Sequence, residues 1–156
     1  MRHYIPLAAA IAFGLALSAC KQPESPAETR EDVQEARAEG QAEVDEAARD
    51  AAEVANEASQ DVTAAAQEGA AETHEAQADA VRDTSEADYD LAITQAEATY
   101  KVEKEKCDAL TGESKDACVK TAEATLATAK ADAQMKLDAA KQAAEAHDEA
   151  ADEHDR

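Results

Sequence analysis

The three cysteines of this chain, Cys20, Cys107 and Cys118, carry the side chains with the most specific chemistry. A thiol can be acylated, form a disulfide or bind a metal ion. The separation of eleven residues between Cys107 and Cys118 matches no common metal-binding spacing. The chemistry of each thiol therefore depends on the compartment of the chain and on the elements that position the side chain.

A second group of candidate ligands lies near the C-terminus, where His147 and His154 are seven residues apart among acidic residues. Imidazole and carboxylate groups both bind zinc, so one helical face could gather a loose metal cluster. A charged, fraying C-terminus commonly has this composition, and no Cys-rich spacing accompanies it. We therefore expect no metal site here, and we expect His74 to be solvated.

Patterns typical of enzymes and of nucleic-acid-binding proteins do not stand out in the sequence. It has no Gly-rich phosphate loop, and its paired carboxylates follow from a composition of 36 Asp and Glu. We therefore expect neither an enzyme nor a bound cofactor. The formal net charge of −21 excludes nucleic acid as a partner, because phosphate binding needs clustered Lys and Arg.

The first twenty residues resemble the leader of a bacterial lipoprotein. Arg2 precedes an apolar run that is shorter than the about 20 residues of a membrane span but suits a signal peptide. The run ends in Leu17-Ser18-Ala19-Cys20, which resembles a lipobox. An ordinary cleaved signal peptide with a coincidental Cys is the alternative. The resemblance implies that residues 1–19 are removed.

The lipobox resemblance also implies the chemistry of Cys20. In that family the thiol takes a diacylglycerol, and the freed amine usually takes a further acyl chain such as palmitate. Two or more chains hold a protein stably on a membrane, at ~0.8 kcal/mol for each buried CH₂. Lys21 occupies the position that resembles the sorting residue of Gram-negative lipoproteins, which implies the outer membrane, facing the periplasm.

The same resemblance leaves Cys107 and Cys118 as two thiols in an oxidising compartment. An even number of cysteines is normally paired there, so we predict a Cys107–Cys118 disulfide. Two free or metal-binding thiols are the alternative.

The composition after residue 19 predicts an all-α, elongated protein. The segment contains no Phe or Trp, is rich in Ala and Glu, and has no Pro after Pro26. We predict a flexible linker at 20–26, then an acidic Ala-rich helix or partly disordered segment at 27–84. A disulfide-closed antiparallel helical hairpin follows at 85–156.

Several features refine this division. Ser85 could cap a helix that restarts there, while Gly40 and Gly69 are weak points of the preceding helix. A helix that continued unbroken from 27 to 110 would reach about 125 Å at 1.5 Å per residue.

Heptad spacing within the acidic segment predicts a seam for association of helices. Its members alternate between separations of four and three residues: Val44, Ala48, Ala51, Ala55, Ala58, Val62 and Ala65. A homo-oligomer could bury this seam. We favour chance in so Ala-rich a segment over a true seam, because the acidic flanks would repel a second copy.

Large apolar residues return in the predicted hairpin and form one row on each helix. The first row contains Tyr89, Ile93, Ala96, Tyr100, Cys107 and Leu110. The second contains Val119, Leu126, Ala133, Ala140 and His147. A turn near 111–114, with Gly112 in the left-handed conformation, would bring Cys107 near Cys118.

The hairpin tip, from Tyr100-Lys101 through Cys107-Asp108-Ala109-Leu110-Thr111-Gly112 to Lys115-Asp116-Ala117-Cys118-Val119-Lys120, resembles a motif in small Ala-rich exported proteins of Proteobacteria. The resemblance implies a hairpin module and no mechanism. The lipobox and the seam also loosely resemble the major murein lipoprotein. That family joins peptidoglycan through a C-terminal Lys, whereas this chain ends in Arg156.

Two functional classes follow from these features. The first is a lipid-anchored structural or spacer protein of the cell envelope, with peptidoglycan or an envelope protein as its partner. The alternative is an interaction module that docks an envelope protein through the 89–137 hairpin.

Overall fold

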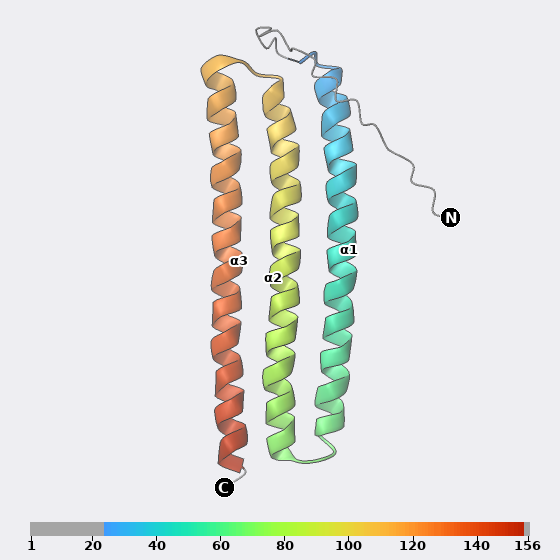
Figure 1. The fold of residues 1–156 in the computed structure, drawn as a ribbon, viewed down its shortest axis with the longest axis vertical. Helices are drawn as coiled ribbons and strands as arrows, with labels where there is room; N and C mark the ends of the chain where they lie inside the picture. Colours follow the sequence, from blue (N-terminus) through green and yellow to red (C-terminus); the bar gives the residue numbers. More distant parts are fainter. Residues whose placement is uncertain (1–23, 155–156) are drawn as a thin grey trace, which may run out of the picture.

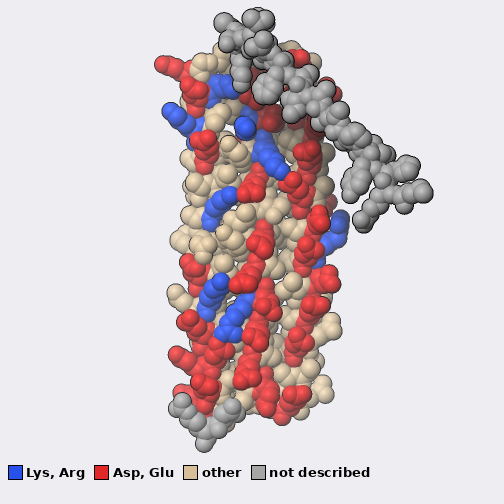
Figure 2. All heavy atoms as spheres, viewed as in Figure 1, with Lys and Arg blue, Asp and Glu red and all other residues tan. Residues whose placement is uncertain are grey.

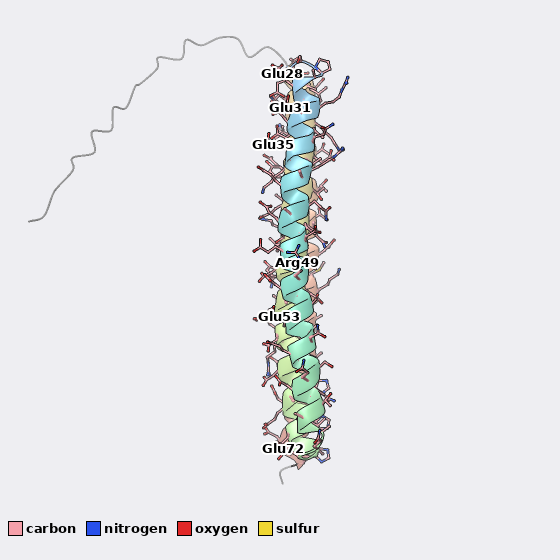
Figure 3. All side chains as sticks on the ribbon, turned by 90° about the vertical axis from the view of Figure 1, so that its right-hand side faces the viewer. Glu28, Glu31, Glu35, Arg49, Glu53 and Glu72 are labelled. Atoms are coloured by element: carbon pink, nitrogen blue, oxygen red, sulfur yellow. A yellow bond between two sulfur atoms is a disulfide. The ribbon has the colours of Figure 1, made fainter. Side chains whose placement is uncertain are left out.

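Three long antiparallel helices lie side by side in the computed structural model, which describes residues 24–154 (Figure 1). They are α1 (Glu28–Ala65), α2 (Ala70–Asp108) and α3 (Gly112–His154). Helix α2 lies in the middle and packs against both neighbours, whereas α1 and α3 do not approach each other. In the view turned by 90°, the helices lie behind one another (Figure 3). The protein is therefore a flat, all-α layer that is one helix thick.

The first helix begins at a reciprocal pair of hydrogen bonds between Ser25 and Glu28. The Ser25 N–H donates to Glu28 Oε2 at 2.9 Å, and the Glu28 N–H donates to Ser25 Oγ at 3.3 Å. This is a capping box, and it places Pro26 in the first turn, where its missing N–H costs nothing. The N–H of Thr29 already donates to the Ser25 carbonyl at 3.0 Å. The predicted 20–26 linker therefore gives way to helical geometry at its C-terminal end.

The prediction of one long acidic segment over 27–84 and a helix restart at Ser85 is wrong. Helix α1 ends at Ala65, residues 66–69 form a turn, and α2 runs unbroken through residue 85. The Ser85 hydroxyl donates to the Arg82 carbonyl at 2.9 Å within the helix, so it caps nothing. Because the chain folds back at Gly69, the 125 Å helix does not form.

Small residues allow α1 and α2 to approach closely. Gly40 is buried, and a Cβ built at Gly40 would lie 2.8 Å from Ala98 Cβ. Gly40 is therefore the contact point of two helices rather than the weak point that the sequence suggested.

The predicted seam of α1 packs against α2 of the same chain. Five of its seven members are buried or half-buried: Val44, Ala51, Ala58, Val62 and Ala65. Ala48 and Ala55 are exposed, and Ala47 and Val54 take their places on the inward row. Most of this row is therefore a packing surface rather than the chance pattern that we favoured, but Ala48 and Ala55 lie off it and its partner is α2 of the same chain.

The predicted rows on α2 and α3 meet in register. Tyr100 and Leu126 line one groove, and Tyr89 and Leu137 line another. Ala133 and Leu137 are buried, whereas Leu110 is 39% exposed at the end of the row. Ala is the commonest residue at this interface, so the two helices pack closely with few large side chains between them.

Candidate functional site

A disulfide between Cys107 and Cys118 closes the α2–α3 hairpin, as the sequence predicted. The two Cα atoms are 5.7 Å apart, and Cys107 is fully buried. Closing a loop this short restricts the unfolded chain and stabilises the hairpin by roughly 2–3 kcal/mol. The disulfide makes this end of the layer its most firmly connected part.

The turn inside the disulfide starts slightly earlier than the predicted 111–114. Helix α2 ends at Asp108, and α3 begins at Gly112, whose φ is +54°. This left-handed conformation favours glycine, as the sequence indicated. The Leu110 N–H donates to the Cys107 carbonyl at 2.9 Å and ties the turn to the end of α2.

Charged groups cross the hairpin tip beside the disulfide. Lys115 Nζ forms an ion pair with Asp108 Oδ1. The hydrogen bond to Asp108 raises the pKa of Lys115. This pair links the end of α2 to the first turns of α3.

The start of α1 lies at the same end of the layer as this tip (Figure 1). Burial raises the pKa of Glu24, and the nearby carboxylate of Asp108 raises it further, while Lys115 lowers it. Glu24 is therefore a neighbour of the hairpin tip. The N-terminal end of the described chain and the disulfide are close together.

Besides the Lys115–Asp108 pair at the tip, four ion pairs join neighbouring helices along the layer. Lys101 Nζ lies 2.7 Å from Glu43 Oε1, and Lys130 Nζ lies 2.6 Å from Glu97 Oε1. The other two join Lys141 to Glu86 and Arg82 to Asp148. Sequence reasoning did not find these pairs, whose partners are 33 to 66 residues apart in the sequence. The signal that could have indicated these pairs is the presence of opposite charges at the same height on adjacent helices.

Three histidines gather at the far end of the layer. The His74 ring centroid is 6.0 Å from that of His147 and 5.4 Å from that of His154. His74 is half-buried rather than solvated, and its Nδ1 is buried without a hydrogen-bond partner. Over residues 24–154, no group of three or more His, Cys, Asp or Glu side chains is arranged to hold a metal ion. The His74 ring at the start of α2 stacks on that of His154 at the end of α3, with an interplanar angle of 12°, and is tilted by 31° against that of His147.

The predicted lipidation site, Cys20, lies outside the described residues, as does the 1–19 leader. Within residues 24–154, no helix is long and apolar enough to cross a membrane. Comparison with models of known families, with curated proteins and with solved structures gave no match.

Proposed function

We propose that this chain is a lipid-anchored spacer of the bacterial cell envelope. The lipobox resemblance supplies the anchor at Cys20, and the flat helical layer supplies a body of defined length. The single observation that carries the proposal is the position of the chain's start. Glu24 lies beside the disulfide-closed tip, so an anchor at Cys20 places a known end of the layer at the membrane.

The length of chain between anchor and body limits how far apart they can be. Glu24 follows Cys20 by four positions in the sequence, and four residue steps span at most about 14 Å when the chain is fully extended. The hairpin tip therefore lies close to the lipid surface. This reverses the orientation expected of an unbroken rod, in which the hairpin would be the most distant part.

The body then reaches a moderate distance from the membrane. Helix α3 has 43 residues, which corresponds to about 64 Å at 1.5 Å per residue. The turn at 66–69 and the three histidines would mark the distal end. The layer would hold any partner of that end about 60 Å from the lipid surface.

The distribution of charge along the layer supports an upright orientation. Residues 24–40 and 97–123, which form the end of the layer with the hairpin tip, carry seven Lys and Arg against thirteen acidic residues. Residues 41–96 and 124–154, which extend to the distal end, carry five Lys and Arg against twenty-two acidic residues. An anionic lipid surface attracts Lys and repels Asp and Glu within a Debye length. The distal end is therefore repelled, and the tip much less so.

Crosslinking in intact cells, followed by mass spectrometry, tests the spacer role. Reactive groups at exposed positions near the distal turn, such as Gln67, should capture peptidoglycan fragments or no single protein. One dominant protein captured along the 89–137 hairpin would favour the interaction module instead. The exposed Thr111 at the tip serves as the matched control position, because it should capture only lipid-proximal material.

A further inference from the structure

One broad face of the layer carries two parallel grooves on either side of α2. The groove between α2 and α3 is continuous, because its middle stretch shares Thr99 and Ala122 with the stretch on one side and Ala92 and Ala133 with the stretch on the other. The groove between α1 and α2 has a floor of Ala36, Gly40, Ala98 and Val102. Both grooves are also lined by Gln95 and Thr99, so they open on the same face. We call this face, with Gln95 and Thr99 on its central ridge, the neutral face.

The charges of the two grooves are opposite and balance each other. The α1–α2 groove has two charged residues, both basic: Arg37 and Lys106. The α2–α3 groove has three acidic residues and one basic residue, namely Asp88, Glu103, Asp132 and Lys136. The lining of the first groove is therefore net +2 and that of the second net −2, so the residues that line the two grooves carry no net charge together, although the chain carries −21.

The opposite face is strongly acidic. Glu97 is two residues from both Gln95 and Thr99, so it points about 200° around α2 from the ridge. A groove between α1 and α2 on this side is lined by six acidic residues and no basic one: Asp50, Glu57, Asp61, Asp83, Glu86 and Asp90. Figure 2 shows a broad face on which acidic side chains form rows along the helices. Charge is therefore segregated between the two faces of the layer.

We propose that a second copy of this chain packs on the neutral face, with a two-fold axis parallel to the helices. Such a rotation places α1 of one copy opposite α3 of the other. Each +2 groove of one copy then faces the −2 groove of the other copy. The α2 ridges of the two copies face each other between these two pairs of grooves. An axis perpendicular to the helices would instead lay each α1–α2 groove along the same groove of the other copy with its ends reversed, so that neither Arg37 nor Lys106 would face an acidic groove. Electrostatic complementarity of this kind selects the partner and fixes the register.

The parallel axis also keeps equivalent ends of the two copies together. Residue 24 of both copies lies at one end of the dimer, so two acyl anchors could enter the same membrane. This agrees with the proposed anchoring but does not depend on it, because the groove charges select the same axis.

The size of the face and the thickness of the layer are compatible with a stable dimer. Helices of 38 and 39 residues are about 57 Å long, and three of them at 8–10 Å spacing are roughly 25–30 Å wide. Complete coverage would involve about 1,500 Å² on each copy, against ~800 Å² on each partner in a standard interface. The acidic faces point outward, about 20 Å apart, which exceeds the Debye length of ≈ 8 Å at physiological salt.

Sedimentation equilibrium of the full chain in a density-matched non-ionic detergent tests the proposal. The unsubstituted chain should be a dimer at about 100 μM. The double variant Gln95→Glu with Thr99→Glu adds two charges to the ridge of the neutral face. It should raise the dissociation constant by at least about tenfold, because like charges would meet in the interface.

The matched control adds two charges at exposed positions of α3 on the acidic face, as Ala127→Glu with Gln134→Glu. The control should leave the dissociation constant unchanged, and circular dichroism should show full helix content in both variants. A monomer before substitution, as expected if the grooves take another protein, would overturn the proposal. An equal response of the two variants would also overturn it.

A photoreactive amino acid at position 55 tests the axis in the same sample. Ala55 and Ala143 are exposed, and the contacts of Gly40 with Ala98 and of Cys107 with Cys118 place them at the same height. Crosslinks between copies should therefore join α1 to peptides around residues 139–143 of α3. Crosslinks from α1 to α1 would contradict the parallel axis.

Discussion

The close contact of α1 with α2 at Gly40 gives a prediction that tests whether α1 folds back on the rest of the chain. The substitution Gly40→Ala places a methyl group 2.8 Å from Ala98 Cβ and 3.3 Å from Ala98 Cα. Neither atom belongs to a flexible side chain that could move aside. The two helix backbones must therefore separate locally, and overpacking of this kind costs typically ~1–3 kcal/mol.

The helix propensity of Ala opposes this cost. In an isolated helix, Gly→Ala stabilises by about 1 kcal/mol. The two terms leave a net loss of roughly 0–2 kcal/mol for Gly40→Ala in the folded protein. The sign of the change in the free energy of unfolding distinguishes a packed α1 from a solvated α1, because in a solvated α1 the same substitution would stabilise the helix.

A compensating substitution sharpens this test. Ala98→Gly alone should destabilise by about 2 kcal/mol, because it removes a buried methyl group and lowers helix propensity. The double variant Gly40→Ala with Ala98→Gly moves the methyl group from one helix to the other. Its stability should return to within about 0.5 kcal/mol of the original chain, since the propensity terms cancel.

Urea denaturation followed by circular dichroism at 222 nm measures these free energies. Additive effects of the two substitutions would contradict the contact, and so would a Gly40→Ala variant that is more stable than the original chain. Ala48→Gly, at an exposed position of α1, is the control for helix propensity alone and should cost about 1 kcal/mol.

Four further predictions concern the disulfide-closed tip, the start of α1 and the anchor. Alkylation without prior reduction should add no alkyl group at Cys107 or Cys118 in intact-mass measurements, and uptake of two alkyl groups would contradict the disulfide. Reduction should lower the stability of the hairpin by roughly 2–3 kcal/mol. Ser25→Ala should cost about 1 kcal/mol in urea denaturation, because it removes the hydroxyl of the capping box, and a neutral effect would argue against the cap. The hydrogen bond from the Ser25 N–H lowers the pKa of Glu28. The contribution of ionised Glu28 to folding stability should therefore be complete above about pH 5 and be lost as the pH falls through the pKa of Glu28 in the folded protein. A Glu28→Gln variant should lack this part of the acid dependence when stability is measured as a function of pH. Cys20→Ser should abolish incorporation of labelled palmitate, whereas retained label would place acylation elsewhere.

The hairpin was predictable because its signals are local and agree with one another. Cys107, Gly112 and Cys118 together specify a turn, a left-handed residue and a covalent closure within twelve residues. The apolar rows that start at Tyr89 and Val119 fix which faces of the two helices meet. Each of these features restricts the same geometry, so the sequence alone determines it.

The fold-back of α1 was not predictable from the same kind of signal. Residues 66–69 contain Gly69 but no Pro, and helix-forming residues lie on both sides, so local propensity favours one long helix. The turn forms because α1 gains an interface with α2, which is a tertiary effect. Val54 carried a signal that the predicted seam omitted, since a β-branched residue among alanines marks the inward row. Exposed Ala55 lies directly beside it.

The histidine stack shows the same limit. His74 is more than seventy residues from His147 in the sequence, and only the antiparallel order of α2 and α3 brings their rings to 6.0 Å. Sequence spacing linked His147 to His154 alone. The third member could be identified only after the register set by Cys107 and Cys118 was extended along both helices.

The orientation of the layer at a membrane is the most direct test of the proposed function. A fluorescent amino acid introduced at Thr111 or at Gln67 would report energy transfer to acceptor lipids in vesicles that carry the acylated full chain. The account predicts strong transfer from position 111 at the disulfide-closed tip and weak transfer from position 67, about 60 Å along the helices. Equal transfer from both positions, or stronger transfer from position 67, would contradict an upright spacer anchored beside its disulfide.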